Sequence, residues 1–158
     1  MSKRPIPVAG AIVTAVLVVL FGNPPFVEWI RNPSNVSGDG VVGFLLKQLI
    51  WPQWKFTPGG AGGDMAAFVA YELRAILIIA LVFGILATLA KGIGSGGVGF
   101  LVGWVSVILA AGLASFITYF ISNIGDSATA LDALAAGGTY GLFIGWIVGI
   151  FTAVAKRG

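Results

Sequence analysis

The sequence predicts an all-α integral membrane protein with four transmembrane helices and a short interfacial helix in the first outer loop. Three observations lead to this fold class: an apolar composition, a scarcity of charge, and four long apolar runs. Of the 158 residues, 58% are hydrophobic and 9% are charged, and the mean hydropathy is +0.99. Soluble domains average about 25% charged residues. So few charges could not cover a soluble surface, whereas a lipid-facing surface needs none.

The four apolar runs give the expected transmembrane helices, at residues 5–22, 66–90, 98–122 and 134–155 of a single membrane domain, 1–158. The first run resembles a signal peptide, because basic residues precede it. The sequence that ends it, FGNP, lacks the small residues of a cleavage site, so we expect a retained helix. The other three runs reach the roughly 20 residues that a span needs.

Residues 23–65 form the expected extracytoplasmic segment. Pro24 and Pro25 should end the first helix, since proline cannot continue it. Residues 40–50 (GVVGFLLKQLI) are apolar but too short to cross a bilayer. We therefore expect a short helix there that lies in the interface or dips into the bundle, with Asp39 as its N-terminal cap.

Aromatic and charged residues at the edges of the spans suggest interfacial roles. Three tryptophans are expected to anchor the outer segment, because indole combines an apolar ring with a polar N–H: Trp29, Trp51 and Trp54. Glu72 and Arg74 lie in the first third of the second span. Two positions apart on a helix, they do not face each other. Each should instead pair with another segment, such as the helix that carries Lys47, in an interfacial structural role.

The basic residues predict that the N- and C-termini lie on the cytoplasmic side. Lysine and arginine beside span ends favour the cytoplasm. With the N-terminus inside, the inner segments hold Lys3, Arg4, Lys91, Lys156 and Arg157. The outer segments hold Arg31, Lys47, Lys55 and Arg74. The inner residues lie close to span ends, where they count most, and the outer loop is long.

Small residues recur at intervals of four in the fourth span: Gly137, Gly141, Gly145, Gly149 and Ala153. This spacing makes a groove that another helix backbone can approach closely. The third span has a similar face with Gly99, Gly103 and Ser106, and the second has one with Ala80, Gly84 and Ala87. The pattern predicts close helix contact. It leaves open whether the contacting helix belongs to the same chain or to a partner.

The absence of cysteine and histidine removes most catalytic and metal chemistry. Haem and iron–sulfur ligation, ordinary zinc sites and Ser–His–Asp catalysis all need these residues. No two carboxylates have a spacing that suggests an active site, so we expect no catalytic residue, no cofactor and no metal. The G-x-G-x-x-G match at residues 92–97 follows a predicted membrane helix instead of a strand, and we interpret it as a tight loop. No block of like charge suggests a nucleic-acid partner.

These observations favour a non-catalytic membrane protein that is a structural or accessory subunit of a homo- or hetero-oligomeric assembly and docks through its Gly-rich helix faces. Its expected partners are the lipid bilayer and other membrane chains or itself. The alternative is a small oligomeric channel or transporter for ions or small solutes, although no acidic residue lies at mid-membrane. Trp146, near the middle of the fourth span, should fill a gap beside the glycine groove or else stack on a bound lipid.

Overall fold

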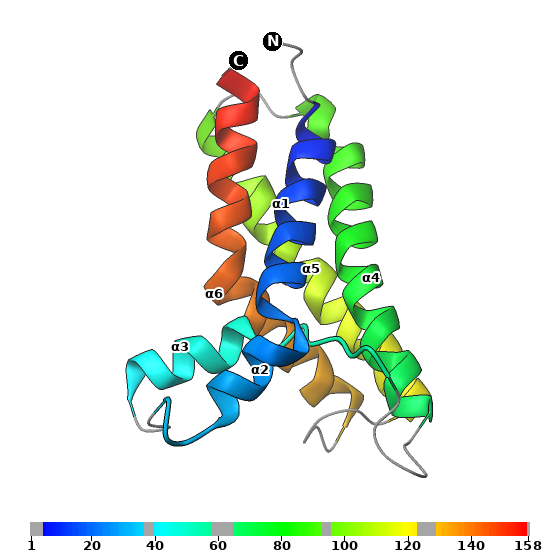
Figure 1. Cartoon of the computed structure of the whole chain (residues 1–158). Coiled ribbons are helices and arrows are strands. Elements are labelled where there is room, and N and C mark those ends of the chain that lie inside the picture. The colour runs from blue at the N-terminus through cyan, green and yellow to red at the C-terminus, as the bar shows by residue number, and fades with distance from the viewer. Residues whose placement is uncertain (1–4, 37–39, 58–64, 93–95, 123–128, 158) are drawn as a thin grey trace.

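Each of the four long apolar runs forms one helix of a bundle in the computed structural model (Figure 1). The structure describes residues 5–36, 40–57, 65–92, 96–122 and 129–157, and these residues contain no strand. The bundle helices are α1 (Ile6–Phe21), α4 (Met65–Leu89), α5 (Gly96–Ser122) and α6 (Ala130–Arg157). The short helices α2 (Pro24–Arg31) and α3 (Val41–Leu49) lie at one end, and the 3-10 turn η1 (Ala90–Gly92) follows α4.

Three helices, α4, α5 and α6, are long and apolar enough to cross a membrane. The number rises to four if α1 and α2, which are bent by 56° at the break between them, count as one span. Alone, the 16 residues of α1 measure about 24 Å, which is less than a hydrocarbon core of about 30 Å. The all-α fold is confirmed, with three or four candidate spans.

Gly22 and Asn23 separate α1 from α2, and the two prolines that were expected to end the first helix begin α2 instead. Helix α1 ends at Phe21, and the Asn23 side chain then caps α2 by accepting a 3.0 Å hydrogen bond from the Phe26 backbone N–H. Pro24 is the first residue of α2. At this position the missing N–H costs nothing, because it would have no partner within the helix.

Helix α3 covers nearly the same residues as the short helix expected over residues 40–50. Its N-cap is Gly40, whose φ of 121° suits glycine, and no side chain caps the helix there. The expected cap, Asp39, lies outside the described residues. The ring of Phe44 packs edge-on against Phe143 of α6, with 5.3 Å between centroids, and this contact ties α3 to the bundle.

Helix α6 begins at Ala130 and not near residue 134, because the Thr129 side chain caps its start. The Asp132 backbone N–H donates to Thr129 Oγ1 at 3.2 Å, and the Thr129 hydroxyl donates to Asp132 Oδ2 at 2.8 Å. A cap of this kind satisfies N–H groups that have no partner inside the helix. The apolar run alone, starting at Leu134, placed the beginning of the helix one turn too late.

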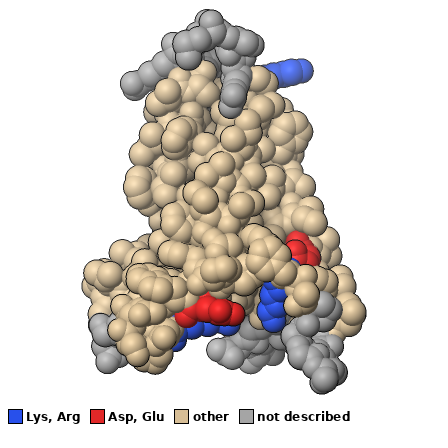
Figure 2. Space-filling view, in the orientation of Figure 1, with Lys and Arg blue, Asp and Glu red and all other residues tan. Residues whose placement is uncertain are grey.

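The core lies where α1, α4, α5 and α6 meet. Its fully buried members come mainly from α4, α5 and α6: Ile78, Val82, Leu86, Val107, Ala110, Tyr140 and Val148. Figure 2 shows charged side chains near the two ends of the bundle and an uncharged surface between them. Helix α1 begins and α6 ends at the same end of the bundle, opposite α2 and α3 (Figure 1).

Candidate functional site

The glycine-rich face of α6 lies against α5 of the same chain. A Cβ atom built on Gly141 would lie 2.7 Å from Ile108 N and 2.8 Å from Val107 O. One built on Gly149 would lie 2.7 Å from Phe100 O. Real Cβ atoms essentially never approach other atoms to within 3.0 Å, so any side chain here would force the helices apart. This face of α6 is therefore covered from inside the chain.

Trp104 of α5 completes the contact. Its indole N–H donates a 3.0 Å hydrogen bond to the Leu142 carbonyl of α6, and its ring lies beside Gly145, where a Cβ would come within 2.9 Å of Trp104 Cδ1. A Cβ on Gly137 would likewise collide with the Ala111 backbone. Sequence reasoning did not single out Trp104. Its only signal was an aromatic residue directly after a glycine of the small-residue face.

The small residues of α5 meet those of α6 at the other end of the contact. A Cβ on Gly99 would lie 3.3 Å from Ala153 Cα, and one on Gly103 would lie 2.9 Å from Gly149 Cα. The Thr152 hydroxyl of α6 donates to the Gly99 carbonyl of α5 at 2.7 Å. The two faces that the sequence indicated separately are thus brought together, and each fills the groove of the other.

Buried hydroxyl groups inside the bundle donate hydrogen bonds to backbone carbonyls of their own helices. Thr14 donates to the Gly10 carbonyl at 2.9 Å, and Thr118 donates to the Ala114 carbonyl at 2.9 Å. Ser106, which the sequence placed on the small-residue face, is fully buried and donates to a carbonyl of its own helix at 2.6 Å. Such bonds to the preceding turn satisfy a hydroxyl without any solute.

Trp146 does not fill a gap beside the glycine groove, so that prediction is wrong. Its side chain is 47% exposed on the outside of α6. The reason is geometric: successive residues on a helix point about 100° apart, since 3.6 residues complete a turn. Gly145 faces α5, and its neighbour Trp146 must therefore turn away from that helix.

A second cluster of polar and aromatic side chains surrounds Arg74 of α4. Arg74 is only 4% exposed, and its Nη2 donates to the Trp51 carbonyl at 3.1 Å. Its guanidinium carbon lies 4.5 Å from the centre of the Trp51 ring and 5.1 Å from that of Tyr71. No ion pair joins Arg74 to a carboxylate among the described residues, and its Nε has no hydrogen-bond partner. Aromatic rings and a carbonyl therefore surround this buried cation.

Glu72 holds the same segment by a different contact. Its Oε1 accepts a 2.6 Å hydrogen bond from the Lys55 backbone N–H, and the Lys55 amine lies 4.7 Å from the centre of the Tyr71 ring. We call residues 50–57 the connecting segment. Glu72 and Arg74 both bind it and do not pair with each other. The suggested pairing with Lys47 is absent: Lys47 is exposed on α3, and the described residues give it no ion pair.

The three expected tryptophan anchors have different surroundings. Trp29 is 49% exposed, whereas Trp51 and Trp54 are partly buried. The Trp51 ring stacks on buried Tyr140 of α6, 5.2 Å between centroids. Trp54 donates its indole N–H to the Val18 carbonyl of α1 at 3.3 Å. Two of the three tryptophans thus attach the connecting segment to the bundle.

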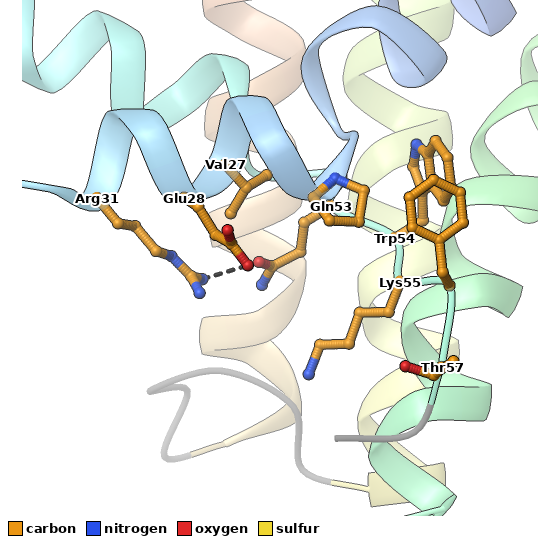
Figure 3. Close-up of a pocket in the computed structure, with 9 residues that line it drawn as sticks. Val27, Glu28, Arg31, Gln53, Trp54, Lys55 and Thr57 are labelled. Carbon is orange, nitrogen blue, oxygen red and sulfur yellow. Dashed lines mark hydrogen bonds between the residues drawn. The ribbon is translucent and has the colours of Figure 1, made fainter. Parts of the chain in front are cut away.

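An open pocket of about 380 Å³ lies between α2 and the connecting segment (Figure 3). Arg31 Nη2 donates to Gln53 Oε1 at 2.8 Å across this pocket, and Glu28 and Lys55 also line it. Its remaining lining residues are Pro24, Val27, Trp54, Phe56 and Thr57.

The described residues contain no group of three His, Cys, Asp or Glu side chains that could hold a metal ion. Comparison of the chain with models of known protein families, with curated proteins and with solved structures finds no match.

Proposed function

We propose that this chain is a multi-pass integral membrane protein whose helices α1, α4, α5 and α6 cross the bilayer, and that it is a non-catalytic structural or accessory subunit of a larger membrane assembly. The distribution of charged and apolar side chains on its surface supports the proposal. Charged side chains lie near the ends of the bundle, with an uncharged surface between them (Figure 2). The exposed large apolar side chains of the bundle helices include Val16, Ile76, Phe83, Leu109 and Ile150. In water such a surface drives association, whereas in a bilayer it faces acyl chains.

The proposed orientation places the termini on the cytoplasmic side. Lys91 follows α4 at the end of the bundle where α1 begins and α6 ends (Figure 1). The sequence assigns the basic residues at the two chain ends to this same side: Lys3, Arg4, Lys156 and Arg157. Lysine and arginine close to span ends favour the cytoplasm, so this end is the one we assign to it.

The open small-residue face of α4 is where we place contact with a helix of another membrane chain or of a second copy. The glycine faces of α5 and α6 cover each other, whereas Ala80, Gly84 and Ala87 on α4 are exposed. A Cβ on Gly84 would meet nothing within 4 Å. Small residues at this spacing allow close helix approach. The channel alternative gains no support from the buried hydroxyls, because helix carbonyls accept their hydrogen bonds.

Single-cysteine labelling tests the membrane topology cleanly, because the chain has no cysteine of its own. Lys91→Cys and Ser34→Cys should react with a membrane-impermeant maleimide from opposite sides of sealed vesicles. Val82→Cys, at a fully buried position, is the control that should stay unlabelled on both sides. Labelling of Lys91→Cys and Ser34→Cys from the same side, or release of the protein by alkaline carbonate, would overturn the four-span arrangement.

A paired substitution tests the accessory role. Gly84→Leu should reduce the size of the complex in native mass spectrometry from mild detergent. Gly138→Leu is the matched control, because a Cβ on Gly138 also meets nothing within 4 Å but belongs to α6. Wild-type masses at multiples of 16.3 kDa would identify a second copy, and other masses a different chain. Wild-type protein that is monomeric throughout, or a complex that Gly84→Leu leaves intact, contradicts the proposal.

A further inference from the structure

The pocket between α2 and the connecting segment carries charges of both signs that are not paired with one another. Glu28 and Arg31 lie three positions apart on α2, a spacing at which opposite charges often pair. Here Arg31 turns instead to Gln53 Oε1, at 2.8 Å. Lys55 reaches the pocket from the opposite wall. No ion pair links these three groups in the described part of the chain. The Glu28 carboxylate can therefore accept from a ligand, and Arg31 and Lys55, which contact Gln53 and the Tyr71 ring, still have N–H groups left to donate.

The pocket also has an aromatic and aliphatic wall. The rings of Trp54 and Phe56 meet edge-to-face with 4.9 Å between centroids, and buried Val27 of α2 also lines the pocket. The face of an indole or phenyl ring attracts ammonium groups. The wall therefore suits the cationic end of a ligand, and the Glu28 carboxylate of the same pocket has the opposite charge.

The position of the pocket narrows the class of ligand. It lies at the end of the bundle that carries α2, between that helix and the connecting segment (Figure 3). In the proposed membrane arrangement, lipid headgroups occupy this level. The volume of about 380 Å³ is at the lower end of the range for small-molecule sites, about 300–1,000 Å³, and fits a headgroup better than a whole lipid.

We propose that this pocket binds the headgroup of a zwitterionic phospholipid with a primary ammonium group. The phosphate lies at Arg31 and Lys55, since guanidinium and ammonium groups form charge-assisted hydrogen bonds with phosphate oxygens. The ammonium lies at Glu28, beside Trp54. The acyl chains follow the apolar outer surface of the bundle. The inference rests on the proposed membrane location, and it adds a specific lipid and the residues that select it.

Lipid retention measured by native mass spectrometry tests this assignment. The full chain is reconstituted with equal amounts of phosphatidylethanolamine and phosphatidylglycerol and then released into detergent. The wild type should retain phosphatidylethanolamine with about tenfold preference, the factor that corresponds to one charge-assisted hydrogen bond. Glu28→Gln should abolish this preference, because only the zwitterionic lipid has an ammonium. Arg31→Gln should lower retention of both lipids, since both have the phosphate.

Two controls keep the result interpretable. Lys47→Gln removes an exposed charge from α3 outside the pocket and should leave retention unchanged. Unfolding temperatures of all variants should stay equal to that of the wild type, since Glu28 and Arg31 are exposed. Equal retention of the two lipids by the wild type, or an unchanged preference in Glu28→Gln, would overturn the proposal.

Soluble phosphoethanolamine separates a failure of the lipid site from a failure of the membrane location. It should not displace the retained lipid, because it lacks the acyl chains. Displacement at comparable concentration would show a site for a soluble molecule and would overturn the lipid assignment. Intact topology in the cysteine experiment together with lost lipid preference rejects the pocket alone, and the proposed function stands.

Discussion

Helices α5 and α6 meet through glycine and backbone atoms, whereas α4 meets the connecting segment through a buried cation, a carboxylate and aromatic rings. In the first contact the backbones approach so closely that the Gly141 position has no room for a Cβ. In the second, Arg74 and Glu72 reach backbone groups at 3.1 and 2.6 Å. The first contact depends on the absence of side chains and the second on directional hydrogen bonds. They should therefore fail under different substitutions.

The largest expected effect comes from closing the glycine groove. Gly141→Ala should lower the free energy of unfolding by about 2–3 kcal/mol, because the methyl group would force α5 and α6 apart. Thermal unfolding followed by tryptophan fluorescence measures the loss. Gly138→Ala is the control: its methyl group meets nothing within 4 Å, and alanine is the better helix former. Equal destabilisation by the two variants would mean that the close contact has no special role.

The polar contact should break when Arg74 is replaced. Arg74→Gln shortens the side chain and removes the charge, which should cost about 2 kcal/mol, the range for a hydrogen bond from a charged group. The amide of Lys55 should then exchange its hydrogen faster, because the connecting segment is released from α4. Arg74→Lys keeps the charge without the planar fork and should recover only part of the loss. Unchanged exchange in Arg74→Gln would show that Glu72 and Trp54 hold the segment alone.

The cap of α6 lies outside both contacts and should have an intermediate effect. Thr129→Ala removes the capping oxygen and should cost about 1 kcal/mol in thermal unfolding. Thr129→Ser retains the oxygen and should behave like the wild type. If serine and alanine were equally destabilising, the loss would come from the threonine methyl group, and the hydroxyl cap would not set the start of α6.

The smallest effect concerns a hydroxyl hydrogen bond inside the glycine contact. Thr152→Val keeps the shape of the side chain but removes the hydroxyl that donates to Gly99, and should cost about 0.6 kcal/mol, the average for hydrogen bonds between membrane helices. Thr88→Val, which loses only a bond to its own helix at 2.7 Å, should cost less. A loss in Thr152→Val as large as that in Gly141→Ala would erase the distinction between the two contacts.

The sequence is sufficient for the helices and for the close contact, and it fails where the answer depends on which segments meet. Apolar runs predict helices because each must satisfy its own backbone, and that property is local. The fourfold glycine spacing predicts a groove, but the identity of the helix that fills it depends on the arrangement of the whole chain. For the same reason the sequence could not predict that the Trp51 ring stacks on Tyr140, because no pattern in the residues around Trp51 indicates this distant partner.

Some signals were present and could have been used. Thr129 and Asp132 have the spacing of a capping box, which would have corrected the start of α6. For Glu72 and Arg74, a charged side chain was expected as the partner, but both instead form hydrogen bonds with backbone groups of the connecting segment. The open pocket at α2 has no linear motif, since its charged residues come from segments about twenty positions apart that fold back on each other.

The position of α1 has a consequence for the order in which the protein assembles during synthesis. Helix α1 packs against α4 and α6, and Gly10 lies close to both Leu86 and Thr152. At about 5–20 residues per second, the ribosome needs roughly 7–27 s after finishing α1 to complete α6. The hairpin of α5 and α6 can form as soon as it emerges, because its halves are adjacent in the chain. Of the four bundle helices, α1 therefore waits longest for the last of its partners, and its apolar surface stays uncovered for that time.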